Sequence, residues 1–222
     1  MSANYSHQTD IFDPTAFTWP VHLIGLGGIG SAVALPLVKL GLRSELHLWD
    51  NDAVESHNIP AQVIYSVADV GKAKVEAAAE FLDRFREPDC TIIAHRDVVT
   101  AQTPLAGVVI SGVDSMASRL AIWEGLEFNP EVPLYMDGRI GGEQLQLFTL
   151  NPCDPEGVDF YKKWLFFTDD EAAPLPCAAR TVIHPPILLA GFVIAQLTRF
   201  ARELPTVRYL DVHARDSQLS KW

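Results

Sequence analysis

The chain has few cysteines and few positive charges, and both shortages exclude classes of protein. Its three cysteines, Cys90, Cys153 and Cys177, form no CxxC pair, so we expect neither a disulfide framework nor a four-cysteine zinc site. The 17 Lys and Arg residues against 28 Asp and Glu residues give a net charge of −11. This balance argues against nucleic-acid binding, which relies on a basic surface.

Targeting and membrane-spanning signals are also lacking. The first Lys or Arg is Lys39, so the N-terminal region has no positively charged secretory signal, and we expect a cytoplasmic protein with no membrane partner. Residues 181–198 form an uncharged run long enough to raise the question of a membrane span. The run contains His184, Pro185 and Gln196, which favour a buried core helix instead.

Hydrophobic residues make up 48% of the chain, which is enough for a full globular core. Short apolar runs alternate with helix-periodic segments, so we predict an α/β, Rossmann-like fold: a mostly parallel sheet with helices on both faces and one antiparallel strand. The expected strands cover 21–24, 45–49, 91–94, 108–111, 133–136, 144–150 (antiparallel) and 207–212, and the expected helices cover 29–40, 70–85, 115–126 and 187–200.

The predicted organisation is a single domain with irregular ends. We expect residues 1–20 to form an N-terminal arm, residues 21–212 to form the folded domain and residues 213–222 to form a polar C-terminal tail. Within the domain, residues 151–180 lack periodicity and are expected to form a long crossover loop over the surface. Long loops of this kind are uncommon unless they serve a function.

The most informative motif is the run GLGGIG at residues 25–30, placed between the first strand and the first helix. Glycines at such a turn let the backbone approach a phosphate, and the helix N-terminus attracts negative charge. Asp50 lies twenty positions after Gly30, at the end of the second strand, where an acidic side chain can bind a ribose. These two features alone fit an NAD-dependent oxidoreductase as well as an ATP-using enzyme.

Polar residues further along distinguish these alternatives. The chain continues with DNDAVESHN at residues 50–58, DVGKAK at residues 69–74 and SGVDS at residues 111–115. This ordered set resembles the ThiF/MoeB/HesA family of adenylating enzymes, which are related to ubiquitin-activating enzymes. The resemblance is strong over residues 21–125 and extends more weakly through residue 200.

The resemblance implies ATP and Mg²⁺ as cofactors. In this family the glycines line the phosphates, the aspartates after the second strand contact the ribose and lie near the metal, a lysine neutralises the triphosphate, and a later aspartate binds Mg²⁺. The implied nucleotide-binding residues are Gly25, Gly27, Gly28, Gly30, Asp50, Asp52, Asn58, Gln62, Lys74 and Asp114, with Asp114 as the metal ligand and Lys74 as the cation at the phosphates. Taken singly, Lys74 could lie on a solvated helix face, Asp114 could cap the following helix, and Asn58 could be a turn residue.

The implied reaction is ATP-dependent adenylation of the C-terminal glycine carboxylate of a ubiquitin-like or sulfur-carrier protein. Two anions must approach each other in this reaction, so cations and helix-terminal N–H groups are needed to stabilise the developing charge. The family usually forms two-fold dimers. We therefore expect a homodimer, with residues 132–150 and 187–200 as candidate interface segments.

One departure from the family weakens the catalytic prediction. Members usually read N-x-x-R-Q where this chain has NIPAQ at residues 58–62, so Ala61 replaces an arginine, and residues 1–38 contain no arginine. Loss of such an arginine can cost roughly a thousandfold in phosphoryl-type transfer. Arg119, Arg139 and Arg180 are possible substitutes, with Arg139 preferred as the catalytic residue. A ThiF-like module that binds nucleotide or partner with weak or lost catalysis stays an alternative.

Cys177 is the candidate nucleophile. Relatives often place a reactive cysteine in this crossover region, and Arg180 together with a nearby helix N-terminus would lower the pKa of the Cys177 thiol. Thioester formation on Cys177 is therefore a predicted second step. The alternative is that Cys177 is a small buried residue that only packs beneath the loop. Cys153 is less suitable because Asp154 would raise its pKa, and Cys90 is expected at the entry of a core strand. No spacing of histidines suggests a metal site.

Overall fold

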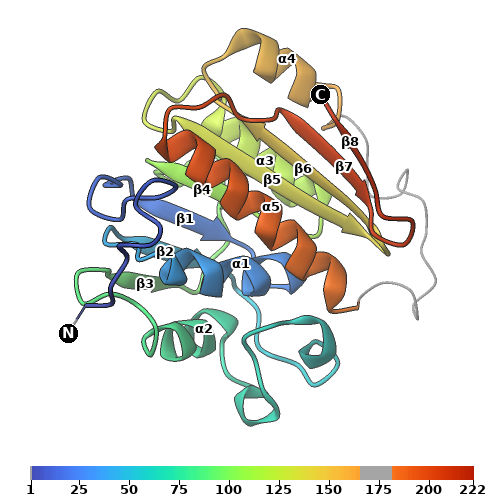
Figure 1. Cartoon of the computed structure of the whole chain (residues 1–222). Coiled ribbons are helices and arrows are strands. Elements are labelled where there is room, and N and C mark those ends of the chain that lie inside the picture. Colours follow the sequence, from blue (N-terminus) through green and yellow to red (C-terminus); the bar gives the residue numbers. More distant parts are fainter. Residues whose placement is uncertain (1, 166–181) are drawn as a thin grey trace.

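The computed structural model describes residues 2–165 and 182–222, which form one eight-stranded sheet in the order β3-β2-β1-β4-β5-β6-β7-β8 (Figure 1). The strands are β1 (Val21–Ile24), β2 (Leu46–Trp49), β3 (Ile92–His95), β4 (Val108–Ser111), β5 (Leu134–Gly141), β6 (Gln144–Leu150), β7 (Tyr209–His213) and β8 (Gln218–Lys221). The α-helices are α1 (Gly28–Lys39), α2 (Lys74–Leu82), α3 (Met116–Leu126), α4 (Pro155–Lys162) and α5 (His184–Ala201).

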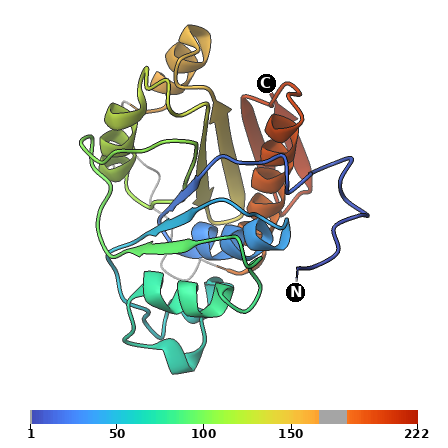
Figure 2. The same cartoon turned by 90° about the vertical axis from the view of Figure 1, so that its left-hand side faces the viewer.

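The five strands β3, β2, β1, β4 and β5, in that order, form the parallel half of the sheet, as predicted. Its central strands β1 and β4 are buried along their whole length because helices cover both faces. One hydrophobic cluster joins α1, α2 and α5 to one face, and a second joins α3 and α4 to the other. Figures 1 and 2 show α3 and α5 on opposite sides of the sheet.

The antiparallel half is larger than expected. Instead of one antiparallel strand, β6, β7 and β8 each pair antiparallel with their neighbour. The prediction of a polar tail at residues 213–222 was wrong, because residues 218–221 form β8 and the Trp222 ring packs 5.3 Å from that of Tyr209. Strand β8 is exposed along its length, so it has no alternating buried face and left no periodic signal in the sequence.

Two helices also differ from the prediction. Residues 151–180 do not form only a loop, because α4 begins at Pro155, with the Asp154 carboxylate accepting hydrogen bonds from the N–H groups of Glu156 and Gly157. Helix α2 is shorter than the predicted 70–85. Gly71 has a φ of +91°, and the Lys74 N–H donates to the Asp52 carbonyl, so residues 70–73 form a turn and a bridge and the helix begins only at Lys74.

The N-terminal arm is irregular, as predicted, but it packs firmly on the domain. Phe12 and Phe17 are buried in the core. The Ala3 N–H and the Tyr5 hydroxyl donate to Glu87, and the Gln8 amide donates to the Leu40 carbonyl. The described part of the arm therefore lies at the C-terminal end of α1, at the opposite end of that helix from the glycine run.

The apolar run at residues 181–198 contributes to α5, which packs along α1 and on β5 and β6. Within residues 2–165 and 182–222, no helix combines the length and hydropathy that crossing a membrane requires.

The turn between β1 and α1 depends on two glycines with different constraints. Gly25 has a φ of +83°, a conformation that L side chains rarely adopt. A Cβ on Gly30 would lie 1.9 Å from the Gly25 carbonyl oxygen, so any side chain there would force α1 away from the turn. A Cβ on Gly27 would meet nothing within 4 Å.

We predict that Gly30→Ala lowers the free energy of unfolding by at least about 3 kcal/mol, because the overlap involves backbone that cannot move aside. Gly27→Ala is the matched control in the same turn and should change the free energy of unfolding by less than about 1 kcal/mol. Urea unfolding followed by circular dichroism measures both. Equal stability losses would contradict the packing role of Gly30.

Candidate active site

A cleft of about 1010 Å³ opens at the carboxyl ends of β1, β2, β4 and β5. It collects almost all of the predicted site residues, although they come from distant parts of the sequence. Those that line it are Gly25, Gly27, Gly28, Asp50, Asp52, Asn58, Gln62, Lys74, Asp114 and Arg139. Of the predicted site residues that the structure describes, Gly30 is the exception, because it packs against the backbone of Gly25 and does not line the cleft.

Asp50 is the central polar group of the cleft floor. One of its carboxylate oxygens accepts the Leu26 N–H at 2.7 Å, and the other accepts the Asp52 N–H at 2.8 Å and lies 3.8 Å from Lys74 Nζ. Burial raises the pKa of Asp50, against the hydrogen bond from Leu26 and the positive charge of Lys74, which lower it. Asp50 thus ties the glycine turn to the loop after β2.

Lys74 is the first residue of α2 and its side chain is buried, at 8% exposure. Nζ donates to Asp52 at 2.7 Å, while the Asp52 side chain is 62% exposed. The alternative that Lys74 lies on a solvated helix face is therefore wrong. Lys72, two residues earlier, is the solvated one and pairs with Asp69 and Glu80.

Tyr65 connects Lys74 to the glycine turn and was missed by sequence reasoning. Its buried hydroxyl lies within hydrogen-bond distance of the carbonyls of Leu26 and Lys74, at 3.2 and 3.3 Å. Burial raises the pKa of Tyr65, with the charges of Asp50 and Asp69 adding to the effect, so the hydroxyl keeps its proton and remains a donor. No motif pointed to Tyr65, since one tyrosine in a loop carries no periodic signal.

The loop after β2 brings Asn58 and Gln62 to the same cleft. A short 3-10 turn, Ile59–Ala61, separates them, and the Asn58 side chain does not cap it. The side-chain oxygen of Gln62 is buried without a hydrogen-bond partner, which marks it as a group able to accept from a ligand. Ala61 is buried, and its carbonyl lies 3.6 Å from where a Cβ on Gly28 would stand.

Asp114 follows β4 and is exposed at the cleft. The alternative that it caps α3 is wrong, because Ser115 is the N-cap and its hydroxyl accepts the Ser118 N–H at 3.0 Å. The Asp114 carboxylate is not needed for that cap. An exposed carboxylate of this kind could hold Mg²⁺, which takes one or two carboxylates together with phosphate oxygens and waters.

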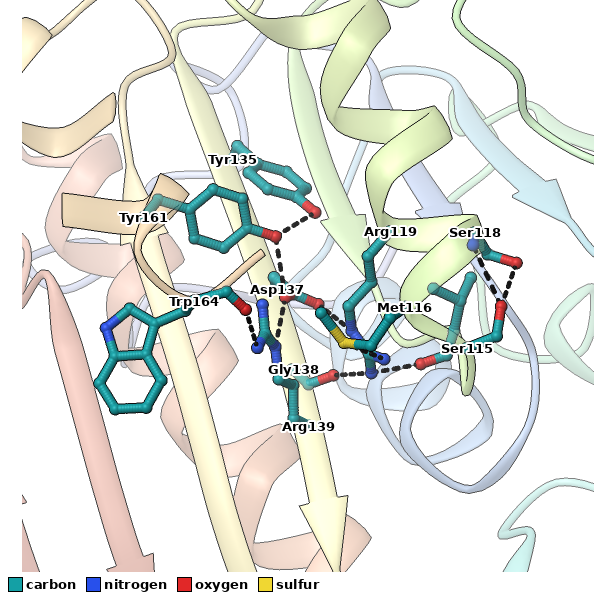
Figure 3. Close-up of polar contacts among 11 residues, drawn as sticks. Ser115, Met116, Ser118, Arg119, Tyr135, Asp137, Gly138, Arg139, Tyr161 and Trp164 are labelled. Atoms are coloured by element: carbon teal, nitrogen blue, oxygen red, sulfur yellow. Dashed lines mark hydrogen bonds and ion pairs between the residues drawn. The ribbon is translucent and has the colours of Figure 1, made fainter. Parts of the chain in front are cut away.

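A buried ionic cluster forms the other end of the cleft (Figure 3). The Asp137 carboxylate is fully buried and accepts from Arg119 Nε at 3.2 Å, Arg139 Nε at 2.8 Å and the Tyr161 hydroxyl at 2.9 Å. The Tyr161 and Tyr135 hydroxyls lie 3.2 Å apart. Burial raises the pKa of Tyr161, and the negative charge of Asp137 raises it further, so Tyr161 stays a neutral donor.

The two arginines of this cluster are placed differently. Arg119 Nη2 donates to the carbonyls of Val113 and Gly138, and Nη1 contacts the Met116 sulfur. Arg139 Nη1 donates to the Trp164 carbonyl at 3.1 Å, but its Nη2 is buried and has no hydrogen-bond partner. Burial opposes the charge on Arg139, yet the net effect, led by Asp137, is to raise its pKa, so it remains a cation.

An apolar section of the cleft was also not predicted. It is lined by Ile24, Trp49, Val98, Val99 and Ile122, which come from the ends of three strands or the loops beyond them and from α3. Trp49 stacks on His95 with ring centroids 3.7 Å apart. These residues read as ordinary core positions in the sequence, so no signal separated them from the rest of the core.

The structure describes two of the three cysteines, Cys90 and Cys153. Cys177 and Arg180 lie outside the described residues. Cys90 is buried just before β3, as predicted, and burial raises its pKa to about 11. Cys153 is exposed and does not line the cleft.

His184 begins α5 and pairs with Glu143 at 3.3 Å. Among the described residues, no group of three or more His, Cys, Asp or Glu could hold a metal ion.

The ThiF family matches the chain over residues 16–200. A NEDD8-activating enzyme E1 catalytic subunit of Saccharomyces cerevisiae is 29% identical over 140 residues, which is 59% of this chain and 46% of that protein. A molybdopterin-synthase adenylyltransferase of Salmonella typhimurium is 33% identical over 141 residues, 61% of this chain and 55% of that protein. The chain thus spans about half the length of these relatives.

Solved structures share the fold. PaaA has a TM-score of 0.70 at 18% identity, and MccB of E. coli, solved with ATP, has a TM-score of 0.70 at 19% identity. Each alignment covers 92% of this chain and 63% of the other. At this level of identity the likeness shows the fold alone.

We predict that Asp137→Asn destabilises the protein by about 3–5 kcal/mol, because it leaves two buried guanidinium groups with no anion. Asp83→Asn is the control: Asp83 forms an exposed pair with Arg86, and its loss should cost under about 1 kcal/mol. Chemical unfolding of both variants tests this. A cost for Asp137→Asn no greater than that of the control would mean that the cluster does not hold the charges together.

Thiol reactivity should follow burial. At pH 8 the exposed Cys153 should react with iodoacetamide in the native protein, whereas Cys90, with its raised pKa of about 11, should react only after denaturation. Peptide mapping by mass spectrometry distinguishes the two sites. Native labelling of Cys90 at a rate like that of Cys153 would show that this region opens readily.

Proposed function

The chain belongs to the ThiF family, and on that premise we propose that it catalyses ATP-dependent adenylation of a carboxylate, the C-terminal glycine of a ubiquitin-like or sulfur-carrier protein. Its relatives, a molybdopterin-synthase adenylyltransferase and a NEDD8-activating enzyme subunit among them, support this reaction class. The chain covers only about half of each relative, so both the whole activity and the partner are part of this proposal.

One observation carries the proposal: the N-terminus of α1, the buried Lys74 and the exposed Asp114 converge on one cleft. Gly27 leaves the backbone there open, and helix N–H groups at this position bind phosphate. An NAD-dependent oxidoreductase would use the glycine turn and Asp50 but has no need for a buried lysine or for Asp114. The oxidoreductase alternative is therefore disfavoured.

The residues of the cleft can act mainly through position and charge. Lys74 donates to Asp52, whose side chain is largely exposed, so a triphosphate entering the cleft can compete for the ammonium group. Asp50 fits a ribose, because each of its oxygens has a lone pair left after binding backbone N–H groups. Asn58 and the unpartnered Gln62 oxygen add polar contacts at the same end.

In this reaction the acceptor carboxylate oxygen attacks the α-phosphorus, and the bond from that phosphorus to the oxygen of the β-phosphate breaks. An acyl adenylate and pyrophosphate result, and no proton moves, because the carboxylate is already ionised. Asp114 would hold Mg²⁺, which supplies charge neutralisation of the phosphates. The protein lowers the barrier by holding two anions together among fixed donors.

The later step and the assembly belong to the same proposal. After adenylation, the thiolate of Cys177 would attack the acyl carbon of the adenylate, forming a thioester and releasing AMP as the bond to the phosphate oxygen breaks. The expected dimer would be cytoplasmic. Of its two candidate interface segments, β5 and β6 are largely buried within the chain, whereas α5 exposes Ile187 and Leu188. The segment around α5 is therefore the better candidate.

A second candidate function is nucleotide or partner binding with weak catalysis. Ala61 is the observation that favours it, because this buried position beside Gly28 provides no cation to the phosphates. The described arm does not supply one either, since it has no arginine and is bound at the far end of α1.

We predict that Lys74→Ala and Asp114→Ala each lower ATP–pyrophosphate exchange by at least about a hundredfold, because each removes a charge at the phosphates. The exchange is measured with candidate ubiquitin-fold proteins that end in glycine. Lys72→Ala is the matched control, as Lys72 points to solvent from the same GKAK segment.

Absence of ATP–pyrophosphate exchange with every cognate partner would contradict the adenylation proposal. ATP binding by calorimetry without any adenylate formed would favour the binding module. Tight NADH binding, insensitive to both substitutions, would favour an oxidoreductase.

A further inference from the structure

The ionic cluster around Asp137 carries one more positive charge than negative charge. Arg119 and Arg139 both bind the single Asp137 carboxylate, and all three side chains are at least nine-tenths buried. A buried excess charge is costly unless something compensates it. Among the described residues, no carboxylate other than Asp137 forms an ion pair with Arg119 or Arg139.

The uncompensated part of this charge is at Arg139. Arg119 uses all three of its nitrogens in contacts with the protein, whereas the buried Nη2 of Arg139 has no hydrogen-bond partner. Asp137 accepts from Arg139 through Nε and not through Nη2, and its two oxygens also accept from Arg119 and Tyr161. Buried donors without partners are rare and call for an explanation such as a ligand.

The guanidinium of Arg139 is also held in one orientation. Nε is bound to Asp137, Nη1 to the Trp164 carbonyl, and the group lies 4.5 Å from the Phe148 ring centroid. A cation fixed in this way loses little conformational freedom when it binds an anion. Figure 3 shows the contacts of Arg139 with Asp137 and with Trp164.

Arg139 and Lys74 make two separate cationic poles. Lys74 is anchored to the loop after β2, while Arg139 lies in β5, and β1 and β4 stand between them in the sheet. Three strand spacings separate their elements by about 14 Å. The glycine turn and Asp114 lie between the poles. Lys74 is therefore placed to bind the phosphates, and Arg139 is placed to bind a second anion.

We propose that Arg139, held by Asp137, binds the carboxylate of the acceptor and presents it for attack on the α-phosphorus. This inference rests on the proposed function and assigns the acceptor end of the cleft. Nη2 donates to one carboxylate oxygen and leaves the other free to form the new bond to phosphorus. Asp137 and Tyr161 are positioning residues, because they act through Arg139.

The test uses two synthetic pentapeptides that end in Gly-Gly, one with a free carboxylate and one with a terminal amide. Calorimetry measures their binding in the presence of an ATP analogue with a methylene group between the α- and β-phosphorus, which blocks transfer. The wild-type protein should prefer the carboxylate by tenfold or more, as expected for a hydrogen bond to a charged group. Arg139→Gln should reduce this preference to less than twofold and leave the affinity for the analogue within threefold.

Arg215→Gln removes the same charge from the exposed β7–β8 turn and should keep the full preference. Arg139→Lys keeps the charge and serves if Arg139→Gln unfolds; it should lose at least threefold of the preference, because one ammonium cannot replace the guanidinium contacts. Thermal unfolding reports whether each variant is folded.

A preference retained by a folded Arg139→Gln would overturn the inference, and so would a wild type that does not discriminate between the peptides. Loss of analogue binding in Arg139→Gln would instead assign Arg139 to the phosphates and contradict the proposal. A wild type that exchanges pyrophosphate but shows no carboxylate preference overturns this inference alone, whereas failure of ATP binding and exchange overturns the proposed function.

Discussion

The Asp50 carboxylate is the interaction on which the cleft depends. It binds the backbone of the glycine turn at Leu26, the backbone of the loop at Asp52, and the charge of Lys74. These contacts join β1, β2 and α2, which are separate in sequence, into one floor. Because a buried carboxylate is stable only when its lone pairs are satisfied, this arrangement also restricts how the three segments can pack. The open backbone of Gly27 and the buried Lys74 then face the same space.

The two halves of the sheet make different contributions to this space. The parallel half ends in loops and helix N-termini at one edge, which is where α/β proteins bind phosphate groups. The antiparallel half begins where β6 pairs with β5, and the register of that pair places Arg139 opposite Gln146 at the far end of the cleft. Asp137 in β5 organises that end as Asp50 organises the other. Asp50 binds backbone N–H groups and the charge of Lys74, whereas Asp137 binds two guanidinium groups and the Tyr161 hydroxyl.

Much of this arrangement could be predicted because it follows from local pattern. The glycine turn, Asp50 at the end of β2 and Lys74 after Gly71 follow one another in the order and spacing that predicted the site, and they line one cleft. Helix α4 was missed although Asp154 and Pro155 form an ordinary helix start, because its short apolar pattern lay within a stretch rich in turn residues. Strand β8 has no buried face, and its pairing with β7 rests on backbone hydrogen bonds that no side-chain pattern records.

The sequence by itself determined the α/β class, the phosphate-binding turn and the family, since each depends on the order and spacing of residues along the chain. Only the tertiary structure decided which charges are compensated. It showed that Lys74 is buried and Lys72 is not, that Ser115 rather than Asp114 caps α3, and that Arg139 keeps an unpartnered nitrogen. The physical reason is that burial and ion pairing depend on residues brought together from distant positions, and sequence spacing carries no information about which partner reaches which charge.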